Sequence, residues 1–296
     1  MNDLYRLPPA EAVLSTAGIS AEGRNFEELF AEFAGQASRR KVRESLETAI
    51  FDYFSALRLP SVPTIYDHLI LSLRPKDVIA TFNWDPFLIQ AAQRNGRVGG
   101  VPQLAFLHGN VLEGFCEEDQ VMGVRGRVCS RCSKPFSPGN LLYPIGEKDY
   151  ESNPAVRSSW RAVKGAFKDA FMVSVFGYSA PTTDVAAIAL LDEAWGGWRN
   201  REMEQFEIID IRPEDDLRRE WGRFIHTHHY EVHPAFTDSW IAKHPRRSGE
   251  AYWSQFFDAQ FINSNPAPLS DDFEALWSWF APLIGAETRK RAEAQP

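Results

Sequence analysis

Short apolar runs, each followed by a polar turn and a helix-like segment, limit the fold of this chain more than any other feature. Residues 77–83, "DVIATFN", are β-branched and apolar, which is typical of a buried parallel strand. The helix-like stretch 85–96, "DPFLIQAAQRNG", follows at once, and the acid and proline at its start are typical of a helix N-terminus. The same order recurs at 171–195 and 205–224, and this alternation predicts a parallel α/β sheet.

Polar side chains gather where two of these strands end. Asn83 and Asp85 follow the first strand, and His108 ends a second apolar run, "PQLAFLHG". Ligands of parallel α/β sheets bind beyond the carboxyl ends of the strands, so we expect these three side chains to form one site. A histidine, an amide and a carboxylate together suit proton transfer and the binding of a polar ligand. The alternative is structural, with Asp85 as a plain helix cap and Asn83 as a turn residue.

The cysteines indicate a metal. Cys116, Cys129 and Cys132 lie within 17 residues in the pattern C-x12-C-x2-C. An odd number of cysteines does not suit a secreted disulfide framework, whereas reduced thiols at this spacing favour zinc, which takes four ligands in a tetrahedron. The alternative is a hairpin that has lost its metal and keeps only a structural role.

These stretches, in this order, resemble the sirtuin family. "TFNWDPFLIQAAQRNG" is similar to the sirtuin T-Q-N-I-D-x-L-H-x-x-A-G stretch, and "LHGN" is similar to L-H-G-S. "CSRCSKPFSPGNLLYPIGE" resembles the second zinc C-x-x-C, and "VFGYSAPTTD" takes the place of the G-T-S segment. "EIIDIRP" resembles the last strand of the nucleotide-binding fold. The resemblance covers roughly residues 77–215, and its G-Y-S form is closer to the prokaryotic sirtuin-like NAD-consuming domains of phage defence.

The resemblance implies a fold and a domain organisation. The fold would be a Rossmann-like parallel sheet with helices on both faces. A helical insertion is expected at 24–75, and a small, zinc-ribbon-like cysteine module at 114–140. Residues 1–215 would form the NAD-binding catalytic domain. Residues 216–296 would be a C-terminal extension that packs on this domain or forms a partner surface.

The resemblance also implies a function, the hydrolysis of NAD to nicotinamide and ADP-ribose by an anti-phage effector. The matching catalytic residues are Asn83, which would hold a ribose hydroxyl or the attacking water, and His108, the general base. Asp85 would anchor the cofactor through hydrogen bonds. The expected cofactor-binding residues are Thr81, Phe82, Gly177, Tyr178, Ser179 and Asp210. Sirtuins have two C-x-x-C pairs, and here the first reads "CEED", so Asp119 would complete a structural zinc site with Cys116, Cys129 and Cys132.

The chain departs from the family at the glycine loop that binds pyrophosphate. The nearest match, Thr16–Ser20, has threonine in place of the first glycine. The opening "MNDL" resembles the stretch after that loop in prokaryotic relatives, which would place the loop ahead of residue 1. The incomplete loop favours one alternative function, a non-catalytic module that binds a nucleotide or a partner. The other alternative is a protein-lysine deacylase, for which no acyl-lysine peptide groove is recognisable.

The net charge and the lengths of the apolar runs indicate which classes of partner the chain can bind. The net charge of −8 would repel phosphate backbones, so we expect no direct nucleic-acid binding. No apolar run has the length of a membrane span, and "MNDLYRLPPAEA" lacks the features of a signal peptide, so we expect a cytoplasmic protein that does not bind membranes. Because free NAD hydrolysis would be toxic, we expect a homo-oligomer or a regulatory protein partner to control it.

Overall fold

The computed structural model describes residues 4–21, 24, 26–139, 141–143, 150, 153–178, 185–196, 205–225 and 229–293. The chain divides into two compact units, each assembled from separate segments of the sequence. Unit 1 comprises Met1–Arg58, Ala80–Phe87 and Ala105–Trp160, and unit 2 comprises Leu59–Ile79, Leu88–Leu104 and Arg161–Pro296.

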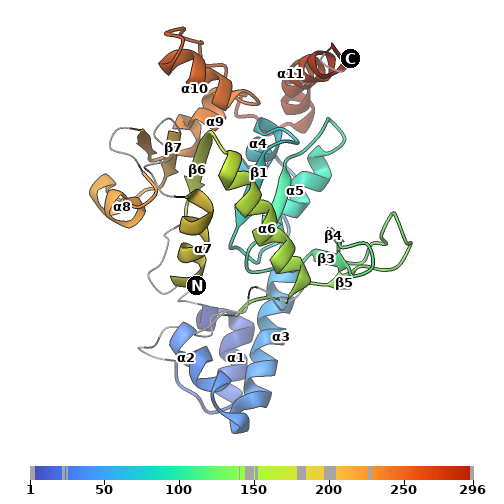
Figure 1. Cartoon of the computed structure of the whole chain (residues 1–296). Helices are drawn as coiled ribbons and strands as arrows, with labels where there is room; N and C mark the ends of the chain where they lie inside the picture. The colour runs from blue at the N-terminus through green and yellow to red at the C-terminus, as the bar shows by residue number, and fades with distance from the viewer. Residues whose placement is uncertain are drawn as a thin grey trace. The chain divides into compact units, whose positions relative to one another are not determined.

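Unit 1 begins with a group of helices, drawn in blue in Figure 1. They are η1 (Leu4–Arg6), α1 (Pro8–Thr16), α2 (Phe26–Ala34), η2 (Ala37–Arg39) and α3 (Arg40–Ala56). Apolar residues of η1, α1, α2 and α3 share one core, in which Phe26, Leu46 and Ile50 have no exposed surface. Trp84 enters the same core from the turn after the first strand, and its ring lies 5.0 Å from the ring of Tyr143. The turn that carries Asn83 and Asp85 is thus fixed by its tryptophan.

The first parallel strands are β1 (Val78–Thr81) and β2 (Gln103–Phe106), which pair with each other. The backbone N–H of Gln103 donates to Asp77 O and that of Leu107 to Thr81 O, both at 2.9 Å. The partners advance by four residues on both strands, so the two strands run in the same direction. Helix α5 (Phe87–Asn95) follows β1 as predicted, and the Asp85 carboxylate accepts the N–H of Phe87 at 3.1 Å.

An antiparallel sheet forms the cysteine module of unit 1. Its strands β3 (Glu113–Cys116), β4 (Val121–Val124) and β5 (Ser137–Pro138) lie in the order β4-β3-β5. Phe136 covers this sheet where glycine leaves space, because a Cβ atom on Gly123 would lie 2.2 Å from its ring.

Unit 2 contains a second parallel sheet, in the order β6-β7-β8. Its strands are β6 (Met172–Phe176), β7 (Gln205–Ile209) and β8 (Tyr230–His233), and every residue of β7 is buried. Helix α7 (Val185–Trp195) and helix α8 (Glu214–Trp221) follow β6 and β7, as the strand–turn–helix pattern predicts. Helix α6 (Pro154–Asp169) precedes β6 and belongs partly to each unit.

A buried polar network crosses this sheet at Glu207, which has no exposed surface. Ser174 Oγ donates to its carboxylate from β6 at 2.6 Å, and the backbone N–H of Trp240 donates at 2.6 Å. His233 Nε2 on β8 lies 3.4 Å from Glu207 and 3.2 Å from Glu231. The carboxylates of Glu207 and Glu231 raise the pKa of His233 to about 9, so the imidazole is protonated at neutral pH.

The other helices of unit 2 are α4 (Ile65–Ser72), η4 (Phe236–Asp238), α9 (Trp240–Lys243), α10 (Ser248–Phe256) and α11 (Phe273–Glu293). Helix α11 packs in the core of unit 2, where Leu276 and Phe280 lie against Leu71 of α4. Arg246 ties these helices together through Glu287 of α11 and the Leu71 carbonyl.

The predicted fold class, mixed α/β with parallel strands, helices and a cysteine module, is confirmed. The bounds 24–75 for a helical insertion and 114–140 for the cysteine module stay predictions. The division at residue 215 into a catalytic domain and an extension stays a prediction. Within the described residues, no helix is long and apolar enough to cross a lipid bilayer.

Candidate active site and metal cluster

The ends of β1 and β2 bring two sequence motifs together in unit 1. Val111 N–H donates to the Trp84 carbonyl at 3.1 Å, and the Asn110 side-chain amide donates to the Asp85 carbonyl at 2.5 Å. The ring of Phe82 meets the imidazole of His108 edge-on, with centroids 4.8 Å apart. The "TFNWD" turn and the "LHGN" loop therefore form one structural feature.

The three predicted catalytic side chains differ in exposure. Asn83 is exposed and Asp85 is half-buried, whereas His108 has no exposed surface. Burial raises the pKa of Asp85, and the hydrogen bond from the Phe87 N–H opposes that shift. Thr81 fixes the turn by accepting the Asn83 N–H on its hydroxyl at 3.0 Å. This arrangement leaves Asn83 open to a ligand and places His108 behind other side chains.

Tyr150 and Trp160, which no sequence motif marks, are among the side chains that cover His108. The Tyr150 hydroxyl lies 3.2 Å from His108 Nε2, and the Tyr150 ring packs edge-on against Trp160 at 5.1 Å. Trp160 Nε1 donates to the Leu107 carbonyl at 3.2 Å. Tyr150 stands far along the chain from the "LHGN" motif, and no local pattern marks it.

Thr81 and Phe82 belong to unit 1, and the other predicted cofactor-binding residues belong to unit 2. Gly177 follows β6 with φ +63°, a left-handed conformation suited to glycine, and a Cβ atom there would meet no neighbour within 4 Å. Its N–H donates to the Ile209 carbonyl at 3.0 Å, which keeps the turn beside the end of β7. Tyr178 packs edge-on against Trp221, at 6.0 Å. Ser179 lies outside the described residues.

Asp210 follows β7 directly, and its carboxylate is bound by Arg212. The guanidinium donates from Nη2 at 2.9 Å and from Nε at 3.2 Å. These hydrogen bonds hold the pKa of Asp210 below its usual value. Asp210 is therefore ionised at neutral pH, and a ribose hydroxyl would have to share it with the arginine.

The interpretation of Thr16–Ser20 as a pyrophosphate loop is wrong. Gly18, at φ +67°, ends helix α1, and the Ile19 N–H donates back to the Leu14 carbonyl at 3.0 Å. This is a helix C-cap, whereas phosphate binds the free N–H groups of a helix N-terminus after a strand. The threonine in place of the first glycine was the signal against the match.

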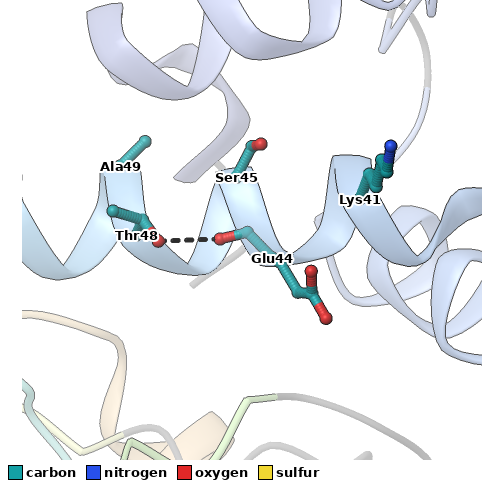
Figure 2. Close-up of a pocket in the computed structure, with 5 residues that line it drawn as sticks. All are labelled: Lys41, Glu44, Ser45, Thr48 and Ala49. Atoms are coloured by element: carbon teal, nitrogen blue, oxygen red, sulfur yellow. Dashed lines mark hydrogen bonds between the residues drawn. The ribbon is translucent and has the colours of Figure 1, made fainter.

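Two surface hollows of unit 1 are lined by residues other than Asn83, Asp85 and His108. One, of about 480 Å³, is lined by Lys41, Glu44, Ser45, Thr48 and Ala49 of α3 (Figure 2). The other, of about 360 Å³, is lined by Tyr5, Arg6, Glu11, Leu14, Ser15, Ile19, Ser20 and Ala21. In the first hollow the Thr48 hydroxyl donates to the Glu44 carbonyl of its own helix, at 2.9 Å. Neither hollow is lined by a predicted catalytic residue.

The four predicted metal ligands do come together. The ligand atoms of Cys116, Asp119, Cys129 and Cys132 all lie within 4.8 Å of one another. Cys116 Sγ is 3.5 Å from Cys132 Sγ and 3.6 Å from an Asp119 carboxylate oxygen, which in turn is 3.1 Å from Cys129 Sγ. A tetrahedron with zinc at its centre has edges of about 3.5–3.8 Å between such atoms. The cluster therefore has the donor set and the size of a metal site.

Two hairpin turns present these ligands. Cys116 and Asp119 belong to the turn between β3 and β4, where Cys116 pairs with Val121. Cys129 and Cys132 belong to a second turn, in which the N–H of Cys129 donates to the Lys134 carbonyl at 2.8 Å. All three thiols are free. Each of the two turns thus presents two of the four ligands.

No protein-family model matches the chain, and no curated protein matches it. Among solved structures, the chain is similar to a Sir2 homologue in complex with NAD, at 13% identity and a TM-score of 0.38 over 74% of this chain and 79% of that one. It is also similar to Sir2Tm bound to a propionylated peptide, at 16% identity and a TM-score of 0.35 over 68% and 78% of the two chains. Scores and identities this low assign the chain no activity.

Proposed function

We propose that the chain is a sirtuin-like hydrolase that cleaves NAD to nicotinamide and ADP-ribose. The observation that carries the proposal is the contact of the Phe82 ring with His108, at the joined ends of β1 and β2. The sequence resemblance names Asn83 and His108 as the catalytic pair, and the fold unites their two loops. Leaving nicotinamide builds positive charge on the ribose, and the general base takes the proton of the attacking hydroxyl.

Incubation of the purified protein with NAD tests this function. We expect release of nicotinamide and ADP-ribose without any peptide, measured by chromatography. Release only in the presence of an acyl-lysine peptide would instead indicate a deacylase. No release in any assembly or with any partner of the protein would indicate a nucleotide- or partner-binding module.

Control of this activity belongs to the same proposal. An NAD hydrolase that is always active would deplete its own cell, so we propose that assembly or a regulatory partner switches it on, in a cytoplasmic anti-phage role. A plot of the specific rate of nicotinamide release against protein concentration tests assembly directly. A rate per chain that rises with concentration supports activation by oligomer formation.

We further propose that the cysteine cluster binds zinc. Three thiolates and one carboxylate fill a tetrahedron, so the metal would stabilise the two turns and keep no open position for catalysis. Zinc would stand between the turns that carry Cys116 and Cys129, and its binding free energy would add to that of folding.

Elemental analysis is expected to find one zinc per chain in the wild type. The Cys129→Ser variant should lose the metal and unfold at lower temperature, because the turns lose their common ligand. Ser130→Ala, an exposed neighbour on the same turn, is the matched control and should keep both properties. A metal-free wild type that is fully folded would contradict the zinc proposal.

A further inference from the structure

The proposed general base lies too deep to meet a substrate directly in this arrangement. His108 has no exposed surface, whereas Tyr150, whose hydroxyl lies 3.2 Å from His108 Nε2, is 7% exposed. A proton that reaches Nε2 along this contact passes through the tyrosine hydroxyl.

The tyrosine is held in the geometry that such a transfer needs. Its ring lies nearly parallel to the imidazole, at 16° with centroids 6.0 Å apart, and packs edge-on against Trp160. Phe82 packs against the imidazole at 4.8 Å and against Trp160 at 6.2 Å. Several ring contacts therefore hold the Tyr150 hydroxyl beside His108 Nε2.

We propose that Tyr150 relays the proton from the attacking hydroxyl to His108, a role that rests on the proposed NAD hydrolysis. A phenolic hydroxyl both donates and accepts a hydrogen bond, so it can pass on one proton while it takes up another. The hydroxyl of a water molecule forms a bond to the ribose carbon as the bond to nicotinamide breaks, and the electron pair leaves with nicotinamide. The water proton moves to Tyr150 Oη, and the tyrosine proton moves to His108 Nε2. Tyr150 ends neutral and His108 ends as imidazolium, which balances the step.

The Tyr150→Phe variant tests the relay because it removes the hydroxyl and keeps the ring. We expect turnover to fall by about 10²-fold or more, while NAD affinity measured by calorimetry stays close to that of the wild type. Tyr143→Phe is the matched control: it also removes a tyrosine hydroxyl of unit 1, one that donates to the Glu47 carbonyl at 2.9 Å, and should leave turnover unchanged.

A second measurement separates a relay from mere support of the fold. Replacing Tyr150 with a fluorinated tyrosine, whose hydroxyl is more acidic, should shift the pH dependence of turnover to lower pH. A supporting ring would leave that profile in place.

Three outcomes would overturn the relay, and they differ in what else they refute. Full turnover by Tyr150→Phe together with an inactive His108→Ala would show that the substrate reaches the base directly, with the proposed function intact. An unmoved pH profile of the fluorinated protein would reduce Tyr150 to packing. Equal nicotinamide release by His108→Ala and wild type, or none from either in the active assembly, would refute the proposed function and the relay with it.

Discussion

NAD turnover by the His108→Ala variant is expected to be about 10²- to 10⁴-fold slower than that of the wild type, with NAD affinity little changed. A general base acts on the proton in the transition state and contributes little to the binding of the ground state. Asn83→Ala should also lose turnover, because the amide no longer positions the water or the ribose hydroxyl. Asp85→Ala should weaken NAD binding more than the other two changes.

Calorimetry of NAD binding beside single-turnover rates, in the active assembly, separates these roles. The folding of Asp85→Ala must be checked first, because its carboxylate also accepts the Phe87 N–H at the start of α5. His68→Gln is the control, since it changes a buried histidine of α4 in unit 2 and should keep wild-type turnover. If His108→Ala and Asn83→Ala both keep full turnover, the active site lies elsewhere.

The free energy of unfolding is expected to decrease as the pH rises from about 5 to 8, because of Glu113 on β3. This side chain is 1% exposed, and neither carboxylate oxygen has a hydrogen-bond partner among the described residues. Burial raises the pKa of Glu113 from 4.5 to about 8. The folded chain therefore holds a proton that the unfolded chain releases in this range, and stability falls as the pH rises. The shift corresponds to a loss of the order of 5 kcal/mol by pH 8.

The Glu113→Gln variant should remove this slope because its side chain is neutral at every pH. At pH 8.5 we expect the metal-loaded variant to be several kcal/mol more stable than the wild type in urea unfolding. Near pH 5 it should be equal or slightly less stable, because the buried amide has more hydrogen-bonding groups to satisfy. Glu44→Gln, on the exposed face of α3, is the control and should keep the wild-type curve. Parallel curves for wild type and Glu113→Gln would mean that Glu113 is ionised in the folded chain.

Local signals made part of this structure predictable from sequence. The apolar run before Asn83 and the acid and proline after it specify a strand end and a helix start within a few residues, and the structure has both. The spacing of the cysteines predicted one metal-ligand cluster, because zinc takes four ligands and three thiols lie within 17 residues. The aspartate in the first pair, identified through the family resemblance, lies within that cluster.

Burial by distant segments was not predictable in the same way. Tyr150 meets His108 only through tertiary packing, and Glu113 stands in "EGFCEED", a stretch whose acids suggest an exposed strand. Gly18 shows that a local motif can also be ambiguous. The stretch "TAGIS" fits both a phosphate loop and a helix C-cap, and only the helix before it decides between them.

The central position of β7 has a consequence for how the chain tolerates truncation. Strand β8 and the Trp240 N–H come from residues after 229, and they supply one whole edge of β7 and two partners of Glu207. A fragment that ends at residue 215 would leave "QFEII" as an apolar edge strand, and the Glu207 carboxylate would keep the Ser174 hydroxyl but lose the Trp240 N–H and His233. Such an edge is a template for intermolecular pairing, so aggregation rather than a soluble catalytic core is the fate of a chain cut there.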